Sequence, residues 1–443
     1  MIAAAMAGHD PARPFLVDVS DAGNRTLPYG ACAAQVDDLV RTHGDLRGAS
    51  VGLRATSEVG TVVWMLALDR LGARCHLIAP STPDSAVHAL VDRFGLHLVG
   101  PVGGDGTSTP GVTGGARGGG TSGADGGTVG EVVVFTSGTT GEPKGVRHTW
   151  ESLSARVHRS AALADARWLL AYSLSAFAGL QVLLHALLNG GSVVLGAGSP
   201  GASMADGAGI THISATPTFV RLLLIGGEAR GLAPEQITLG GEPVDQPLLD
   251  RVRSRFPSAK VTHIYASSEM GTCFSVHDGM AGFPTSYLES DEQPVWLTIR
   301  DGELHIRSPH AMRGYEDAAD PRDETGLFAT GDLVEVIGDR VEFRGRRTEV
   351  VNVGGQKVHP REIEEVLLDD PRVRTARVWG ARSSVAGQLV RAEVVAVDGT
   401  DEAGLRRELL ARCQHRLAPY KVPRLLKVVD SLEHNDAGKL VRR

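Results

Sequence analysis

The chain has 443 residues, of which 42% are hydrophobic and 22% are charged, and its net charge is −7. A single hydrophobic core stops growing near ~250–300 residues, so this length predicts at least two domains. The acidic balance and the lack of a basic run argue against a nucleic-acid partner. The four cysteines form no CxxC pair, which argues against a zinc ribbon or a disulfide scaffold and favours a cytoplasmic protein with reduced thiols.

Short β-branched runs alternate with helical patterns along most of the chain. A strand at 51–53 is followed by a helical pattern at 58–71, and a strong strand at 131–135 by a helical pattern from about 148 to 165. Such alternation is typical of βαβ units in a largely parallel sheet. Further strands are expected at 96–99, 192–195, 211–214, 236–239 and 261–265.

Two stretches have an unusual composition. Fourteen of the 31 residues at 100–130 are glycine, and such a segment cannot bury enough apolar surface to offset its chain entropy, so we expect a flexible surface loop. Residues 168–205 contain no Asp, Glu, Lys or Arg, but glycines and polar residues interrupt the apolar run. A membrane span needs ~20 mainly apolar residues, so we interpret this stretch as strand, helix and strand in a buried sheet, with no membrane partner.

The C-terminal part of the chain has a different pattern. Residues 341–344 and 349–353 look like paired strands around Gly345, and 360–370 like a helix that begins with proline and acidic residues. Strands at 373–379, 389–397 and 424–429 and a helix at 401–416 are expected as well. The pattern predicts a compact α+β domain of about a hundred residues.

A loop rich in glycine and hydroxyl residues follows the strand at 131–135, and it contains one of only six lysines in the chain. Glycine allows close backbone approach, hydroxyls donate hydrogen bonds and lysine is a compact charge, so the loop can cradle a polyphosphate. It is not a Walker A loop, in which Ser or Thr follows the lysine. The candidate phosphate-binding residues are Thr136, Ser137, Gly138, Thr139, Thr140, Gly141 and Lys144.

The segment TSGTTGEPKGV resembles the phosphate-loop signature of the ANL superfamily, which comprises acyl-CoA synthetases, peptide-synthetase adenylation domains and luciferases. The resemblance implies an α/β fold with a large N-terminal, AMP-binding domain of βαβ-rich subdomains at 1–346 and a small mobile α+β domain at 347–443. It also implies that the chain uses ATP and Mg²⁺, with Lys144 in a catalytic role.

Two further segments resemble family motifs that surround the nucleotide. Leu239-Gly-Gly-Glu-Pro243 resembles a segment that lines the adenine pocket, and Tyr265-Ala-Ser-Ser-Glu269 resembles the Y-G-x-T-E motif. The second match implies that Tyr265 stacks on adenine, that Ser268 contacts phosphate and that Glu269 is catalytic and binds Mg²⁺ together with Thr140. The nucleotide-binding residues implied by the two motifs are Gly241, Glu242, Pro243, Tyr265, Ala266, Ser267 and Ser268.

The C-terminal motifs follow in the family order. Thr330-Gly-Asp332 resembles the TGD motif, which implies that Asp332 binds ribose, and Arg346 would contact ribose or phosphate. In the segment at 352–357 the resemblance implies that Gly355 lines the pantetheine channel and that Lys357 meets the nucleotide phosphate. The C-terminal Gly-Lys pair implies that Lys439 is the catalytic residue that bridges carboxylate and α-phosphate.

The resemblance implies a two-step reaction. A small carboxylic acid becomes an acyl-adenylate, and the small domain then rotates so that a thiol, expected to be coenzyme A, captures the acyl group as an acyl- or aryl-CoA. Transfer to a carrier protein or to an amine, and unusual or non-ligating chemistry on the same scaffold, stay open, and the oligomeric state is unknown. The expected acyl pocket consists of Phe177, Thr216, Gly240, Gly241, Ala266, Met270 and Cys273.

Three positions depart from the family pattern. Thr348 stands where the hinge residue is usually Asp or Lys, so the hinge is expected at Arg347–Thr348. Ala176 stands where an aromatic or histidine gate is usual, which implies a reshaped acyl and thiol channel. The residues at 433–436 are less basic than in the family, which bears on the efficiency of adenylation.

Overall fold

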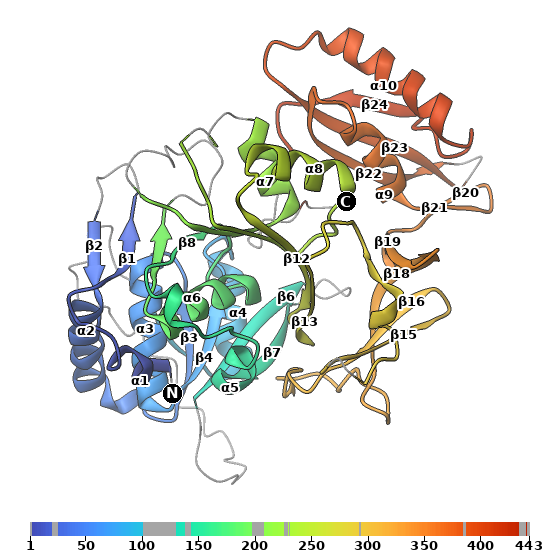
Figure 1. Ribbon diagram of the computed structural model, residues 1–443. Helices are drawn as coiled ribbons and strands as arrows, with labels where there is room; N and C mark the ends of the chain where they lie inside the picture. The colour runs from blue at the N-terminus through green and yellow to red at the C-terminus, as the bar shows by residue number, and fades with distance from the viewer. Residues whose placement is uncertain are drawn as a thin grey trace.

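The structure of the protein is a computed structural model (Figure 1). It describes residues 2–19, 25–100, 130–137, 143–196, 208–225, 229, 231–291, 294–383, 387–433 and 440. The expected glycine-rich loop lies almost entirely outside the described residues. So do four residues of the phosphate loop, Gly138, Thr139, Thr140 and Gly141, and the C-terminal Lys439.

A six-stranded sheet carries the strands on either side of the phosphate loop. Its order is β17-β7-β6-β4-β3-β5, in which β5, β3, β4 and β6 run parallel and the next two strands antiparallel. Its strands are β3 (Ser50–Arg54), β4 (Arg74–Ile78), β5 (His97–Val99), β6 (Glu131–Ser137), β7 (Pro143–Thr149) and β17 (Gly314–Tyr315). The antiparallel hairpin β6–β7 therefore fixes both ends of the phosphate loop on one sheet.

An eight-stranded sheet has the order β13-β12-β11-β10-β8-β9-β1-β2, with a parallel centre and antiparallel pairs at both edges. Its strands are β1 (Pro14–Asp18), β2 (Arg25–Pro28), β8 (Arg167–Leu170), β9 (Ser192–Leu195), β10 (His212–Ala215), β11 (Gln236–Leu239), β12 (Lys260–Ser267) and β13 (Gly271–Val276). The carboxyl ends of β11 and β12 lead directly into the two motifs expected to surround the nucleotide.

Helices α3 and α6 lie between the two sheets (Figure 1). Residues of both helices and of both sheets form one hydrophobic cluster, and α3 is buried on almost every side. A helix that is apolar all round belongs in such a central layer. The helices of this body are α1 (Ile2–Met6), α2 (Tyr29–Thr42), α3 (Glu58–Leu71), α4 (Asp84–Phe94), α5 (Trp150–Ser154), α6 (Phe177–Asn189), α7 (Pro217–Ile225) and α8 (Gln246–Arg255).

An antiparallel five-stranded sheet of order β14-β19-β18-β16-β15 follows the second motif. Its strands are β14 (Phe283–Pro284), β15 (Trp296–Arg300), β16 (Glu303–Arg307), β18 (Phe328–Ile337) and β19 (Arg340–Arg346). Strand β18 contains the TGD segment and β19 ends at the residue expected to contact ribose. In β18 and β19 Asp332 faces Arg346 across the ladder, which brings these two residues together.

The last unit has its own core and packs beside α7, α8 and β19 (Figure 1). Its core residues all lie between Val351 and Leu426. Its sheet has the order β21-β20-β23-β22, with β24 parallel to β23. Its elements are β20 (Val351–Val353), β21 (Gln356–Val358), α9 (Pro360–Leu368), β22 (Val373–Ser383), β23 (Gly387–Ala396), α10 (Glu402–Arg416) and β24 (Leu425–Val428).

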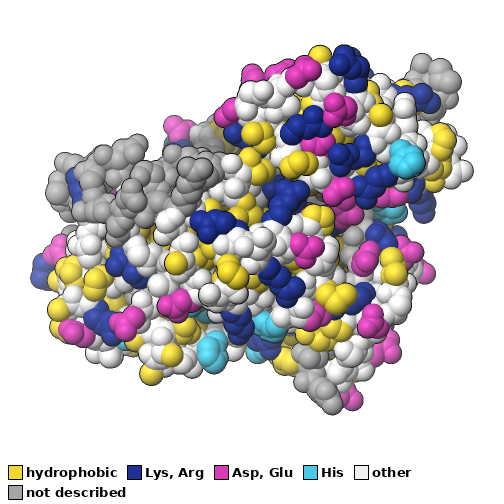
Figure 2. Space-filling model, turned by 45° about the horizontal axis from the view of Figure 1, so that its top comes forward, with side chains coloured by type: hydrophobic (Ala, Val, Ile, Leu, Met, Phe, Trp, Pro, Cys, Tyr) yellow, Lys and Arg dark blue, Asp and Glu magenta, His cyan; other side chains and the backbone are white. Residues whose placement is uncertain are grey.

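The structure confirms the expected α/β fold with a large N-terminal and a small C-terminal part. The charge-free stretch at 168–205 contains strand β8, helix α6 and strand β9, as expected. Within the described residues, no helix is long and apolar enough to cross a membrane. On the face drawn in Figure 2, acidic and basic side chains are interspersed.

Two local predictions are wrong. The helix expected from about 148 to 165 is the end of β7 followed by the five-residue α5, which Thr149 and Ser152 cap reciprocally. The strands near Gly345 do not pair with each other, because β19 pairs with β18 and β14, whereas β20 pairs with β21 and β23. In both cases pairing with other strands decides the structure, and local sequence patterns do not encode that pairing.

Candidate active site

The phosphate-loop hairpin places its lysine opposite a threonine. In the β6–β7 ladder Thr136 faces Lys144, and Ser137 faces Pro143. Gly145 follows the lysine, and a Cβ there would lie 2.9 Å from Val133 Cγ1 and 3.2 Å from Glu316 Cβ. The packing thus requires glycine at this position, which holds β7 close to its neighbours and fixes where Lys144 leaves the sheet.

Tyr315 connects two of the expected catalytic residues. The Lys144 ammonium lies 5.2 Å from the centre of the Tyr315 ring, a cation–π distance. The Tyr315 hydroxyl donates a hydrogen bond to Glu269 Oε1 at 3.3 Å. Burial, followed by the charge of Glu269, raises the pKa of Tyr315, so the hydroxyl stays a donor. The lysine of the phosphate loop and the glutamate of the second motif therefore meet at one side chain.

A second chain of contacts joins the expected adenine and ribose residues. The Tyr265 hydroxyl donates to Asp332 Oδ2 at 2.5 Å, and Arg346 Nε lies 3.1 Å from Asp332 Oδ1. The carboxylate of Asp332 raises the pKa of Arg346, while burial and then Asp332 raise that of Tyr265. The Tyr265 ring lies nearly parallel to the rings of Phe274 and Phe343.

Glu269 lies within electrostatic reach of this second chain, since its charge contributes to the raised pKa of Arg346. Lys144, Tyr265, Glu269 and Asp332 come from β7, from β12 and the residues after it, and from β18, which belong to three different sheets. The fold thus gathers one lysine, one arginine and two carboxylates around a single region.

The backbone of the second motif is held from outside the motif. Buried His148 on β7 contacts the Ser268 carbonyl oxygen through Nε2 at 2.6 Å, and burial lowers the pKa of this histidine. Ser267 Oγ accepts from the Met270 amide at 3.0 Å, and the Glu269 carbonyl accepts from the Met312 amide at 2.7 Å. These bonds fix the turn that presents Glu269. Ala266 precedes the turn and is partly buried against the main core.

The loop after β11 is fixed by two sets of hydrogen bonds. Tyr172 donates to the Gly240 carbonyl at 3.1 Å, and a Cβ at Gly240 would lie 2.8 Å from Ile264 Cγ1. The Glu242 carboxylate accepts from the Thr218 amide and hydroxyl at 3.1 and 2.7 Å, so it caps α7. Gly241 and Pro243 on either side of Glu242 are exposed. Glu242 therefore orders the expected adenine loop through its contact with α7.

The expected acyl-pocket residues separate into two groups. Phe177 begins α6, and its ring lies 5.7 Å from that of His148, while Thr216 Oγ1 accepts from the Phe219 amide. Met270 and Cys273 instead lie fully inside the core around β13 and β16, and burial raises the pKa of the Cys273 thiol to about 12. The expected gate position, Ala176, precedes α6 without a side-chain cap.

The hairpin β20–β21 holds two expected site residues that the structure keeps away from the others. Gly355 and Lys357 are exposed, and the Gly355 amide donates to the side chain of Asn352 in the same hairpin. The expected hinge Arg347–Thr348 lies in a short 3-10 turn, Arg347–Glu349, where Arg347 Nε donates to Glu303 at 2.8 Å.

A partly buried charge cluster, which sequence reasoning missed, supports the strands under Lys144 and Tyr315. Glu131 accepts from Arg74 Nε at 2.7 Å and from Arg147 at 3.0 Å, and Glu316 accepts from Arg74 Nη1 at 3.0 Å. Burial acts against ionisation of Glu316, but His76, Arg74 and Arg147 together hold its pKa below the usual range. The sequence signal was the dipeptide Tyr315-Glu316, yet its partners lie on other strands.

The donor set fits a magnesium ion that binds together with a nucleotide. Mg²⁺ in nucleotide sites is usually held by one or two carboxylates and by substrate phosphates, rather than by an all-protein cage. Glu269 supplies a carboxylate beside Lys144, and no group of three or more His, Cys, Asp or Glu ligands gathers anywhere in the described part of the chain. Thr140, the other expected ligand, lies outside the described residues.

Comparison with known families gives two matches. Residues 131–316 match the model of the AMP-binding enzyme family, and residues 362–439 match that of the AMP-binding enzyme C-terminal domain. The curated 2-succinylbenzoate–CoA ligase of Bacillus velezensis is 32% identical over 341 residues, which cover 70% of this chain and 67% of the relative. The enzyme of the same name from Bacillus subtilis is 32% identical over 340 residues, with the same coverage.

Solved structures show the same fold. The o-succinylbenzoate CoA synthetase of Bacillus subtilis, in complex with its acyl-adenylate intermediate, aligns with a TM-score of 0.73 at 23% identity and covers 99% of this chain and 96% of its own. An anthranilate CoA ligase in complex with anthranoyl-AMP aligns with a TM-score of 0.77 at 18% identity, covering 99% and 95%. These likenesses extend over both the large and the small part of the chain.

Proposed function

The chain belongs to the AMP-binding enzyme family, and we propose that it is an ATP-dependent, AMP-forming acid–thiol ligase that converts an aromatic carboxylic acid into its coenzyme A thioester. The observation that carries this proposal is the pair of contact chains Lys144–Tyr315–Glu269 and Tyr265–Asp332–Arg346. They bring positive charge for phosphate, a carboxylate for a hard cation and a carboxylate for ribose hydroxyls to one region.

In the first step a carboxylate oxygen of the acid attacks the α-phosphorus of ATP, and the bond to the β-phosphate oxygen breaks as pyrophosphate leaves. Lys144, with Thr136, Ser137 and residues 138–141, would hold the β- and γ-phosphates, and Asp332 with Arg346 the ribose. Lys439 would bridge the attacking carboxylate and the α-phosphate. Magnesium, held by Glu269 and Thr140, supplies charge shielding. Positioning and electrostatic stabilisation of this kind account for most phosphoryl- and nucleotidyl-transfer catalysis.

In the second step the thiolate of coenzyme A attacks the acyl carbon, and AMP leaves with the electrons of the broken acyl–oxygen bond. We propose that residues 347–443 rotate as a unit about Arg347–Thr348 between the two steps. The exposed tip of the hairpin, residues 354–357, supports this proposal, because Gly355 and Lys357 face solvent in the present arrangement. A single site then runs both reactions in succession.

The aromatic substrate is inferred from the relatives and from the pocket. The curated relatives are 2-succinylbenzoate–CoA ligases, and an anthranilate CoA ligase shares the fold. Near the start of α6 the ring of Phe177 packs against that of buried His148, so an aromatic wall adjoins the turn that presents Glu269. We therefore expect benzoate derivatives to be activated in preference to aliphatic acids.

We place this reaction in the cytoplasm. All four cysteines are buried as free thiols, which suits a reducing compartment. The partners of the chain are then small molecules, namely the acid, ATP and coenzyme A.

The test is ATP–pyrophosphate exchange with the purified chain and a panel that contains benzoate, 2-succinylbenzoate, anthranilate and aliphatic acids of similar size. We expect exchange with one or more aromatic acids, followed by a thioester when coenzyme A is added. Exchange without a thioester would support adenylation but exclude coenzyme A as the acceptor, which would then be a carrier protein or an amine. A lack of exchange with every acid would overturn the proposal.

A further inference from the structure

The two parts of the chain enclose a cavity of about 240 Å³ on the side of α8. Asp245 and Gln246 at the start of α8, the turn before β14 and Phe343 of β19 form the side that belongs to the large part. Arg361 and Glu365 of α9, together with Arg416 of α10, form the side that belongs to the small part. The cavity therefore lies where the small unit docks.

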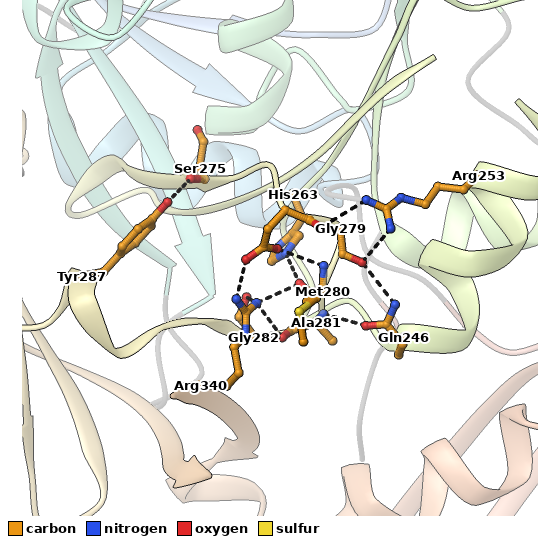
Figure 3. A network of polar contacts seen from close by, with 11 residues as sticks. Gln246, Arg253, His263, Ser275, Gly279, Met280, Ala281, Gly282, Tyr287 and Arg340 are labelled. Atoms are coloured by element: carbon orange, nitrogen blue, oxygen red, sulfur yellow. Dashed lines mark hydrogen bonds and ion pairs between the residues drawn. The ribbon is translucent and has the colours of Figure 1, made fainter. Parts of the chain in front are cut away.

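The floor of this cavity is held rigidly (Figure 3). The turn at 278–282 is clamped by Arg340, which donates to the carbonyls of Met280, Ala281 and Gly282 at 3.0, 2.9 and 3.1 Å. Gln246 adds bonds to the Gly279 carbonyl and the Ala281 amide, and Arg253 donates to the Gly279 carbonyl. A clamp from two elements, β19 and α8, gives α9 a fixed surface to meet.

Arg361 makes the polar contact across the cavity. Its Nη2 donates to the Val244 carbonyl at 3.3 Å, directly after the expected adenine loop, and its Nε donates to Glu365 at 2.7 Å. Its Cβ lies within 3.8 Å of where a Cβ on Gly345 would stand, so the side chain also touches the strand that leads into the hinge. Only 14% of the Arg361 side chain is exposed.

Two acidic residues, Asp245 and Glu365, line the cavity together with Arg361. Asp245 caps α8 and pairs with buried Arg221, while Glu365 faces Asp245 from α9. Burial raises the pKa of Glu365, Arg361 opposes that shift and Asp245 adds to it. Without Arg361 the two carboxylates would repel across the contact, in addition to the loss of the bond to Val244.

In this same arrangement the tip of the hairpin, residues 354–357, is exposed to solvent, as expected of a state that does not serve thiol transfer. We infer that Arg361 is a positioning residue that docks the small domain in the arrangement used for adenylation, through its bond to the Val244 carbonyl. The inference rests on the proposed function, in which the domain rotates between the steps. Rotation must break this bond, so its strength sets the balance between the two half-reactions.

The test compares Arg361→Ala and Arg361→Lys with wild type and with Arg407→Ala. Arg407 is exposed on α10, so its removal is a control for lost charge in the same domain. Acid-dependent ATP–pyrophosphate exchange reports adenylation, and thioester formation from a supplied acyl-adenylate reports transfer. A hydrogen bond to a charged donor is worth enough to shift the ratio of transfer to adenylation by about ten-fold.

We expect Arg361→Ala to lower the rate of exchange about five- to ten-fold, while the rate of transfer is kept or accelerated. Arg361→Lys should be intermediate, because lysine keeps the positive charge but loses the planar guanidinium fork. Hydrogen exchange supplies an independent structural signal: amides at 351–358 should become more protected in Arg361→Ala and should not change in Arg407→Ala. Equal loss of both half-reactions, or unchanged values for all three, would overturn the inference. Failure of the proposed function would instead appear as a wild type without exchange on any acid.

Discussion

Lys144 and Lys357 are both expected to contact the nucleotide, but the fold places them in opposite environments. Lys144 leaves a strand of the six-stranded sheet and stands over the Tyr315 ring, and a partly buried cluster of two arginines and two glutamates joins the neighbouring strands. Lys357 stands exposed on a three-residue strand of a small hairpin. One side of the site is preorganised, and the other must be brought to it, which is what a two-step ligase with one site requires.

The largest effect is expected at the C-terminus, where one substitution tests the division between the preorganised side and the mobile side of the site. Lys439→Ala removes the charge that would orient the attacking carboxylate, so acid-dependent pyrophosphate exchange should fall by about 10²–10³-fold. Thioester formation from supplied acyl-adenylate should survive, because that step does not use this lysine. Both rates are measured on the same preparation, and a parallel loss of the two would contradict the division of labour.

The preorganised side is tested next by Gly145→Ala. The added Cβ would stand 2.9 Å from Val133 Cγ1 and 3.2 Å from Glu316 Cβ, and overpacking of this kind costs about 1–3 kcal/mol. We expect a lower midpoint of urea unfolding at unchanged m-value, together with slower exchange, because the strand that holds Lys144 must shift. A variant with full stability would show that β7 is less confined than its contacts indicate.

Tyr315→Phe separates the two contacts of Tyr315. The ring stays under Lys144 while the hydrogen bond to Glu269 is lost, and such a bond is worth about 0.5–1.5 kcal/mol. We expect ATP to bind about two- to ten-fold more weakly in the presence of Mg²⁺ and with little change in its absence, as measured by isothermal titration. Tyr315→Leu should weaken binding in both conditions, because it also removes the cation–π contact.

The smallest effect is expected on the mobile side. Gly355 has φ +88°, and nothing lies within 4 Å of where its Cβ would stand, so Gly355→Ala adds backbone strain without a clash. That strain is about 1 kcal/mol, so transfer to coenzyme A should slow two- to five-fold. The same strain should lower the free energy of unfolding by about 1 kcal/mol, whereas exchange should match wild type. Equal damage to exchange would show that the hairpin already contributes to adenylation.

Most strands and helices were predictable where the signal is local. The helix at 58–71, the strand at 236–239 and the charge-free strand–helix–strand unit follow from apolar periodicity and from flanking glycines and caps. The hairpin partner of β6 was not predictable, because a helical pattern from about 148 competed with a strand that only its pairing stabilises. The role of Tyr315 was not predictable either, because β17 is only two residues long and is a strand only through its pairing with β7.

The sequence by itself determined the family of this protein: the phosphate, adenine, ribose and C-terminal lysine motifs follow one another in the order of adenylate-forming enzymes. The tertiary structure decided which residues act on one another. Tyr265 reaches Asp332 across 67 residues, Tyr315 reaches Glu269 across 46, and Arg361 reaches Val244 across 117. Residue types and local spacing determine which protons and hydrogen bonds each side chain can donate or accept. Pairing between distant strands and domains forms only when the whole chain packs.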